Sequence, residues 1–208
     1  MSRSFSILHT LAYHLWTGPA EPVFRLARAQ QAAGHRVRMA FDLHREGDLS
    51  AKVEEWELEL QPGFCLSPKA GPIMHMRDVL AFKRLFASGE FDFVHCHRSH
   101  DHTLAALARP RSSPTRLLRT LHSQRAASPS RRWQLQRADG LISVSRAMRD
   151  DLRGRLRLAE ERIIAIEGAV DSERYQPGRQ GRLHQELGLP HDALLVGMVA
   201  RMKAGRGH

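Results

Sequence analysis

Residues 4–41 read SFSILHTLAYHLWTGPAEPVFRLARAQQAAGHRVRMAF, and this stretch decides the fold. A short apolar run breaks at a Gly- and Pro-containing turn, and Pro22 then stands where the first turn of a helix tolerates proline. Gly34 is placed to end that helix. Residues 35–41 alternate apolar and polar side chains, as a strand does. The stretch therefore predicts a strand–helix–strand unit of the kind that builds parallel sheets.

The same rhythm continues to residue 168. Ser128 and Ser145 stand at two expected helix starts, where a hydroxyl accepts a hydrogen bond from a free backbone N–H group. Strands that alternate with helices at this interval predict a Rossmann-like, doubly wound, mainly parallel α/β sheet. Further strands are expected at residues 56–61, 91–96, 115–122, 140–145 and 162–167, and further helices at 76–89, 102–110, 128–139 and 146–156.

The pattern changes after residue 168, where the chain becomes polar and rich in turn-forming residues. We expect residues 1–168 to form one Rossmann-like domain and residues 169–191 to form an interdomain linker. Residues 192–208 hold one apolar run followed by a basic, Gly-rich turn, and no helical segment follows. They predict the first strand and turn of a truncated second domain.

Composition narrows the class of partner. The formal net charge of +10 predicts binding to anions, such as nucleotides or acidic lipid headgroups. Cys65 and Cys96 are the only cysteines, which argues against a disulfide framework and favours a reducing compartment. The longest apolar run, residues 193–200, is far shorter than the ~20 residues that span a bilayer. Aromatic residues are only 6% and do not interleave with the arginines, so nucleic acid is not the expected partner.

Residues 91–102, FDFVHCHRSHDH, place four histidines directly after an apolar run. The set His95, His97, His100 and His102 has spacing close to that of zinc ligands, and it leaves a zinc-dependent hydrolase open. The alternative is a buried strand whose last residues reach the carboxyl edge of the sheet, where open α/β folds bind their ligands. The preceding strand–helix pattern favours this second interpretation, with His97 and His100 facing a cleft.

Several stretches, in order, resemble the retaining nucleotide-sugar glycosyltransferases of family 4, which have the GT-B fold of two Rossmann-like domains. Residues 91–97, FDFVHCH, are similar to the family's D-V-V-H-x-H strand, and residues 119–123, RTLHS, to its strand that ends in a cleft histidine. The other stretches are residues 17–37 (the first loop and helix), 138–152 (ADGLISVSRAMRDDL), 166–177 (IEGAVDSERYQP) and 194–208 (LLVGMVARMKAGRGH).

The resemblance implies an N-terminal, acceptor-side domain followed by the beginning of a donor-binding domain. It implies that His122 is the catalytic cleft histidine beside the donor sugar. It places Gly18, Arg201 and Arg206 at the donor diphosphate, with Arg206 in place of the family's lysine. His97 and His100 would line the acceptor side.

The implied reaction transfers a sugar from a nucleotide sugar to an acceptor hydroxyl with retention, without a metal or other cofactor. The implied acceptor is a glycan, lipid-linked or of the cell envelope, and the protein is expected in the cytoplasm, with peripheral contact to anionic membrane. This stretch of chain alone is expected to be inactive, because the family's main donor contacts belong to the second domain. A non-catalytic, basic Rossmann-like binding module is the remaining alternative, since fold alone does not fix chemistry.

Overall fold

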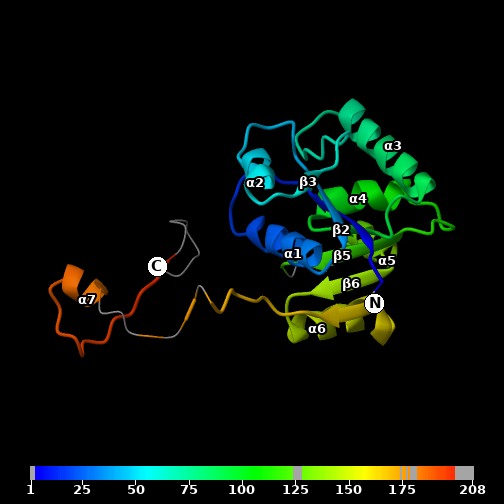
Figure 1. Cartoon of the computed structure of the whole chain (residues 1–208). Helices are drawn as coiled ribbons and strands as arrows, with labels where there is room; N and C mark the ends of the chain where they lie inside the picture. The colour runs from blue at the N-terminus through cyan, green and yellow to red at the C-terminus, as the bar shows by residue number, and fades with distance from the viewer. Residues whose placement is uncertain (1–2, 124–127, 174, 177, 179–181, 200–208) are drawn as a thin grey trace. The chain divides into compact units, whose positions relative to one another are not determined.

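Seven parallel strands form one sheet in the order β3-β2-β1-β4-β5-β6-β7 (Figure 1). This computed structural model describes residues 3–123, 128–173, 175–176, 178 and 182–199. The strands are β1 (Ser6–Leu11), β2 (Arg36–Phe41), β3 (Glu59–Leu60), β4 (Phe93–Cys96), β5 (Arg116–Leu121), β6 (Gly140–Ser143) and β7 (Ile163–Ala165). The helices are α1 (Glu21–Ala32), α2 (Leu49–Glu55), α3 (Pro72–Ser88), α4 (Ser99–Ala108), α5 (Pro129–Gln136), α6 (Arg146–Leu156) and α7 (Arg182–Glu186), with a 3₁₀ turn at Glu160–Arg162.

Helices cover both faces of the sheet, because alternate side chains of each strand point to opposite faces. On β2, Met39 and Phe41 pack against α1 and α2. The residue between them, Ala40, belongs to a second apolar cluster with α3 and α4. The predicted doubly wound, Rossmann-like fold is therefore confirmed.

The strand order reverses at β1, which lies between β2 and β4. The chain moves outward from β1 through β2 to β3, then crosses back to β4 and continues in the opposite direction to β7 (Figure 1). Such a reversal separates the connections that leave neighbouring strands, and it leaves a crevice at their carboxyl ends. The ends of β1, β4 and β5 are consequently where a ligand site is expected.

Local signals placed several helix ends correctly. The Ser128 hydroxyl accepts a hydrogen bond from the Arg131 backbone N–H at 3.2 Å, and Ser145 does the same for Met148 at 3.2 Å. Gly34 follows α1 with φ of 88°, in the left-handed region that glycine reaches without strain. These predicted caps and the predicted helix end are confirmed.

Several expected bounds were wrong: α3 begins at Pro72 rather than at residue 76, and α5 ends at Gln136 rather than at residue 139. Two further differences have a clear physical reason. The strand predicted over residues 56–61 is only Glu59–Leu60, because Leu49 and Val53 bury one face of the unexpected helix α2 and Trp56 closes it. The Trp56 ring packs on Trp16 at 5.3 Å between centroids, against the apolar cluster of α1 and α2. Helix α4 begins at Ser99 rather than near residue 102, because the Asp101 carboxylate accepts the Arg98 backbone N–H at 2.9 Å and holds the first turn.

The chain divides into two compact units between residues 168 and 169, and the sheet belongs to the first. In the second, residues 194–199 lie outside any helix or strand, unlike the strand expected there. A strand needs a neighbour for its backbone groups, and the described residues of this unit contain none. The division into domain, linker and second domain stays a prediction. In the described residues, every helix is too short or too polar to cross a membrane.

Candidate functional site

Three buried histidines meet at the carboxyl ends of β1 and β4. His9 on β1 lies directly opposite His95 on β4 in the strand pairing, and His97 follows two residues later. Nδ1 of His9 and Nε2 of His97 are 3.0 Å apart. On the other side of its ring, Nε2 of His9 is 2.7 Å from Oε1 of Gln30 on α1. The Nε2 of His95 is 2.7 Å from the Thr120 hydroxyl on β5.

These contacts form a chain of hydrogen bonds from α1 to His97. With the Gln30 oxygen as acceptor, His9 donates from Nε2 and must accept at Nδ1. His97 then donates to His9 from Nε2, so its Nδ1 carries a lone pair. That Nδ1 atom is buried and has no hydrogen-bond partner in the described structure. Gln30 thus sets the tautomer of His97 through His9.

Burial keeps the three rings neutral. It lowers the pKa of His9 to about 4, and it lowers the pKa values of His95 and His97 well below the ordinary value. Repulsion among the rings and from Arg119 acts in the same direction for His95 and His97. At neutral pH the cluster therefore offers hydrogen-bonding nitrogens and lone pairs rather than positive charge.

The four-histidine set of the zinc hypothesis is not the set that the fold gathers. Ring nitrogens of His9, His95 and His97 lie within 4.8 Å of one another, whereas His100 packs its ring on His75, 4.8 Å between centroids. His102 is buried within α4, and neither of its ring nitrogens has a hydrogen-bond partner in the described structure. Among the described residues, the group that could hold a metal at this edge includes His9, which the spacing of residues 95–102 does not contain.

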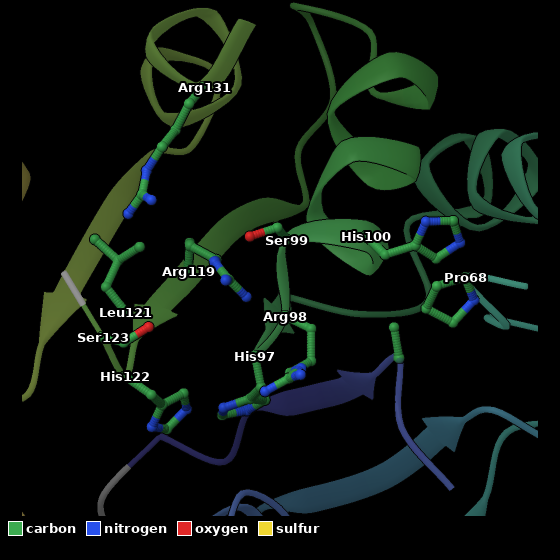
Figure 2. Close-up of a pocket in the computed structure, with 11 residues that line it drawn as sticks. Pro68, His97, Arg98, Ser99, His100, Arg119, Leu121, His122, Ser123 and Arg131 are labelled. Carbon is green, nitrogen blue, oxygen red and sulfur yellow. The ribbon is translucent and has the colours of Figure 1, made fainter. Parts of the chain in front are cut away.

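A pocket of about 230 Å³ opens beside the histidine cluster, at the ends of β1, β4 and β5 (Figure 2). It brings together three predicted site residues, His97, His100 and His122, and the rings of His97 and His122 are 5.9 Å apart between centroids. Loss of hydration, then the charges of Arg119 and Arg98, lower the pKa of His122. The remaining lining residues are Ala12, Pro68, Arg98, Ser99, Arg119, Leu121, Ser123 and Arg131.

Behind the pocket, Arg119 and Asp101 form a buried pair. The Asp101 carboxylate accepts the backbone N–H groups of His97, Arg98 and His102 and the hydroxyl of Thr10. Burial raises the pKa of Asp101 to about 6, and the charge of Arg119 opposes that rise. The nearest Arg119 nitrogen lies 3.9 Å from Asp101 Oδ1, an ion pair but not a hydrogen bond.

The other predicted site residues lie elsewhere. Gly18 is exposed in the turn between β1 and α1, with no atom within 4 Å of where a Cβ would stand, and it is not among the residues that line the pocket. Its open surroundings leave room for a ligand to approach the backbone. Arg201 and Arg206 lie outside the described residues, so their placement at a diphosphate stays a prediction.

Sequence reasoning missed His9 and Arg119. The usable signal was a polar side chain inside an otherwise apolar, fully covered strand: His9 interrupts SILHTL and Arg119 interrupts RLLRTL. Both are almost completely buried, at 0% and 5% exposure. Such residues are rare in parallel strands and are retained where they are paired or bind something.

The sequence pattern described as Glycosyltransferase Family 4 matches residues 16–174, more than half of the chain. This chain belongs to glycosyltransferase family 4. The match covers α1, all strands from β2 to β7 and every described residue that lines the pocket except Ala12. The predicted family is therefore confirmed.

Individual relatives agree with this placement. D-inositol 3-phosphate glycosyltransferase 1 of Catenulispora acidiphila is 31% identical over 139 residues, covering 57% of this family 4 chain and 33% of the relative. A glycosyltransferase from Rickettsia africae has the same fold, with a TM-score of 0.67 and 15% identity, over 91% of this chain and 51% of that one. Anabaena HepE, solved in complex with UDP-glucose, gives a TM-score of 0.61 and 15% identity, over 88% and 50%.

The chain spans about a third of the curated relative and about half of each solved structure. At 15% identity, the likeness to these two solved structures shows a shared fold and says nothing of a shared substrate. The activity of the family 4 protein as a whole is accordingly a matter for proposal.

Proposed function

We propose that this chain supplies the acceptor-side half of a retaining glycosyltransferase, which moves a sugar from a nucleotide-sugar donor to an acceptor hydroxyl. The observation that carries the proposal is the pocket that gathers His97, His100 and His122 at the reversal of strand order, within the segment that matches the family. Anabaena HepE, which shares the fold, was solved with UDP-glucose, and this supports a nucleotide-sugar donor here.

In this mechanism the bond between the anomeric carbon and the diphosphate breaks first, and its electron pair leaves with the diphosphate. The sugar becomes oxocarbenium-like, and the acceptor hydroxyl attacks from the same face while its proton passes to the departing phosphate oxygen. His122, neutral because its pKa is lowered, hydrogen-bonds a sugar hydroxyl and orients the ring. Gly18, Arg201 and Arg206 hold the leaving diphosphate, whose growing charge two cations stabilise.

The acceptor is a glycan, lipid-linked or of the cell envelope, and it lies against His97 and His100. The net charge of +10 supports peripheral contact with an anionic membrane from the cytoplasmic side. The reaction needs no metal. The 208-residue chain alone turns over no donor, because donor contacts of the kind that the family's second domain supplies are needed for the step.

Histidine ring protons offer a direct test on the 208-residue chain. Titrating it with nucleotide sugars and saccharide acceptors should shift the ring resonances of His97, His100 and His122 and leave the exposed His44 unchanged. Release of nucleoside diphosphate, measured in parallel, should stay at background. The proposal fails if every ligand leaves the three pocket histidines unshifted, or if mass spectrometry finds one zinc per chain that is lost in His97→Ala.

A further inference from the structure

The pocket beside the histidine cluster carries a concentrated positive charge. Three of its lining side chains are arginines, Arg98, Arg119 and Arg131, and they come from the β4–α4 junction, β5 and α5. None of the described residues that line it is acidic. Its three histidines add no charge at neutral pH, because loss of hydration lowers the pKa values of His97, His100 and His122.

Arg119 is the most deeply buried of these charges. Its side chain extends from β5 into the pocket (Figure 2), and the residue is only 5% exposed. Its Nη1 atom is buried without a hydrogen-bond partner in the described structure. Asp101 is its one ion-pair partner among the described residues, at 3.9 Å. Buried guanidinium groups are ordinarily held by close carboxylates or by a bound anion.

Asp101 cannot close this gap by moving toward Arg119. Its two oxygens already accept hydrogen bonds from the Thr10 hydroxyl and from the backbone N–H groups of His97, Arg98 and His102. These four donors fix the carboxylate at the first turn of α4. Asp101 therefore offers no closer partner to Arg119, whose side chain lines the pocket.

We propose that this pocket binds the phosphate group of a phosphorylated acceptor, with Arg119 as its principal ligand and Arg98 and the first turn of α4 as further ones. This inference rests on the proposed transferase function and adds the chemical class of the acceptor. It also explains why a parallel strand buried on both faces carries an arginine.

Charge and size both favour a phosphate. Three guanidinium groups and the Asp101 carboxylate sum to about +2, which matches the −1.5 to −2 of a phosphate monoester near pH 7. Ser99 and His100 bring the positive end of the ten-residue helix α4 to the same place. At about 230 Å³ the pocket is smaller than the ~300–1,000 Å³ of sites that enclose whole ligands, so it suits one charged group and part of its carrier.

Arg98 is held in place for this role. Its guanidinium carbon lies 5.2 Å from the centre of the Tyr13 ring, a cation–π contact that limits the conformations of the side chain. Arginine presents a planar fork that pairs with two phosphate oxygens, which a lysine does not. Two such forks, Arg98 from the β4–α4 junction and Arg119 from β5, would bind one tetrahedral anion.

The test measures binding to the 208-residue chain by titration calorimetry at pH 7.5 and constant ionic strength. The ligands are a hexose phosphate, its neutral parent hexose, inorganic phosphate and UDP. We expect the hexose phosphate to bind at least about tenfold more tightly than the hexose, since charge-assisted hydrogen bonds discriminate on that scale.

Arg119→Gln should weaken the hexose phosphate by about 10- to 100-fold. The affinity of Arg119→Lys for the hexose phosphate should lie between those of the unsubstituted chain and Arg119→Gln. Lysine keeps the positive charge but cannot pair with two phosphate oxygens as the planar guanidinium does. Arg116→Gln is the matched control: it lies on the same strand, its side chain is 64% exposed and pairs with Asp139, and it does not line this pocket. If Arg119→Gln does not fold, as judged by circular dichroism, Arg98→Gln takes its place with the same expectation.

Equal affinity for hexose and hexose phosphate, or an equal loss in Arg116→Gln, would overturn the inference. So would tighter binding of UDP that Arg119→Gln weakens to the same degree, because the anion would then come from the donor. If nucleotide sugars and saccharides shift the ring resonances of the pocket histidines while neither hexose phosphate nor inorganic phosphate binds, the inference about the acceptor fails and the transferase proposal stands. If neither set of ligands binds, both fail.

Discussion

The two ends of the same strands differ in how completely their polar groups are satisfied. At the amino ends, the Asp92 carboxylate accepts the Ser6 backbone N–H at 2.9 Å, and Asp139 accepts that of Leu117 at 2.7 Å. The Thr115 hydroxyl donates to the Phe91 carbonyl oxygen at 2.7 Å. These hydrogen bonds hold neighbouring strands together at this edge.

At the carboxyl ends the reverse holds. Of eight buried side-chain nitrogens without a hydrogen-bond partner in the described structure, three belong to the pocket residues His97, His100 and Arg119. Two more belong to His102, in α4 beside the pocket. Native proteins keep such groups rare, because each costs the free energy of its lost hydration. The unpartnered nitrogens gather at the carboxyl ends of the strands, which indicates that this edge binds a ligand. The hydrogen bonds at the amino ends instead stabilise the fold.

Asp101 is the exception at the carboxyl edge, and removing it should give the largest effect. Asp101→Ala deletes the acceptor of three backbone N–H groups and leaves Arg119 as a buried charge without a carboxylate. We expect the free energy of unfolding to fall by about 3–5 kcal/mol. Urea unfolding followed by circular dichroism measures this loss.

Asp150→Ala is the matched control for that variant. Asp150 pairs with Arg149 on the surface, where its side chain is 59% exposed, and such pairs contribute little. We expect a change below about 0.5 kcal/mol. Comparable losses of unfolding free energy in Asp101→Ala and Asp150→Ala would contradict a special stabilising role for the Asp101 carboxylate at the carboxyl ends of the strands.

Acidification should weaken the fold through the same edge. Burial lowers the pKa of His9 to about 4 and that of His102 to about 3, so below their ordinary value of 6.5 the unfolded chain binds protons that the folded chain refuses. Stability is then lost as pH falls from 6.5 toward those values. Asp101 acts in the opposite direction, because its pKa is raised to about 6 and the folded chain takes up its proton first.

The histidines outweigh Asp101 between pH 7 and pH 5. His9 and His102 together lower the free energy of unfolding by about 4 kcal/mol over this range, and Asp101 raises it by about 1 kcal/mol. We therefore expect a net loss on the order of 3 kcal/mol. His95 and His97, lowered in the same direction, add to this loss. Unfolding curves at the two pH values measure it, and equal stability at both would show that the rings are not buried neutral.

The sequence predicted the sheet better than the site, for a physical reason. Strand and helix positions follow from local periodicity and caps such as Ser128 and Ser145, which act within a few residues. The strand expected over residues 56–61 shrank to Glu59–Leu60, because Trp56 caps α2 and its ring packs on Trp16. Local pattern and tertiary packing conflicted there, and packing decided.

The site depends on contacts between distant positions. The end of an apolar run correctly located His97 at the carboxyl edge, because parallel strands end together. Its partner His9 is 88 residues away, and the two meet only through the register that sets His9 opposite His95. Arg119 could be recognised only as an arginine inside a buried strand, and nothing local shows that Asp101 stops 3.9 Å short of it.

The smallest expected effect separates groups kept for a ligand from groups that are merely unsatisfied. His102 does not line the pocket, and both of its buried ring nitrogens lack partners. His102→Leu should therefore raise the free energy of unfolding at pH 7 by about 1–2 kcal/mol, since it removes two unmet hydrogen-bonding groups at similar volume. The gain should grow by about 2 kcal/mol between pH 7 and pH 5, because the variant no longer refuses a proton in that range. His44→Leu, on the exposed surface, should change neither value. A large loss in His102→Leu would instead mean that this ring, like Arg119, belongs to the ligand-holding edge.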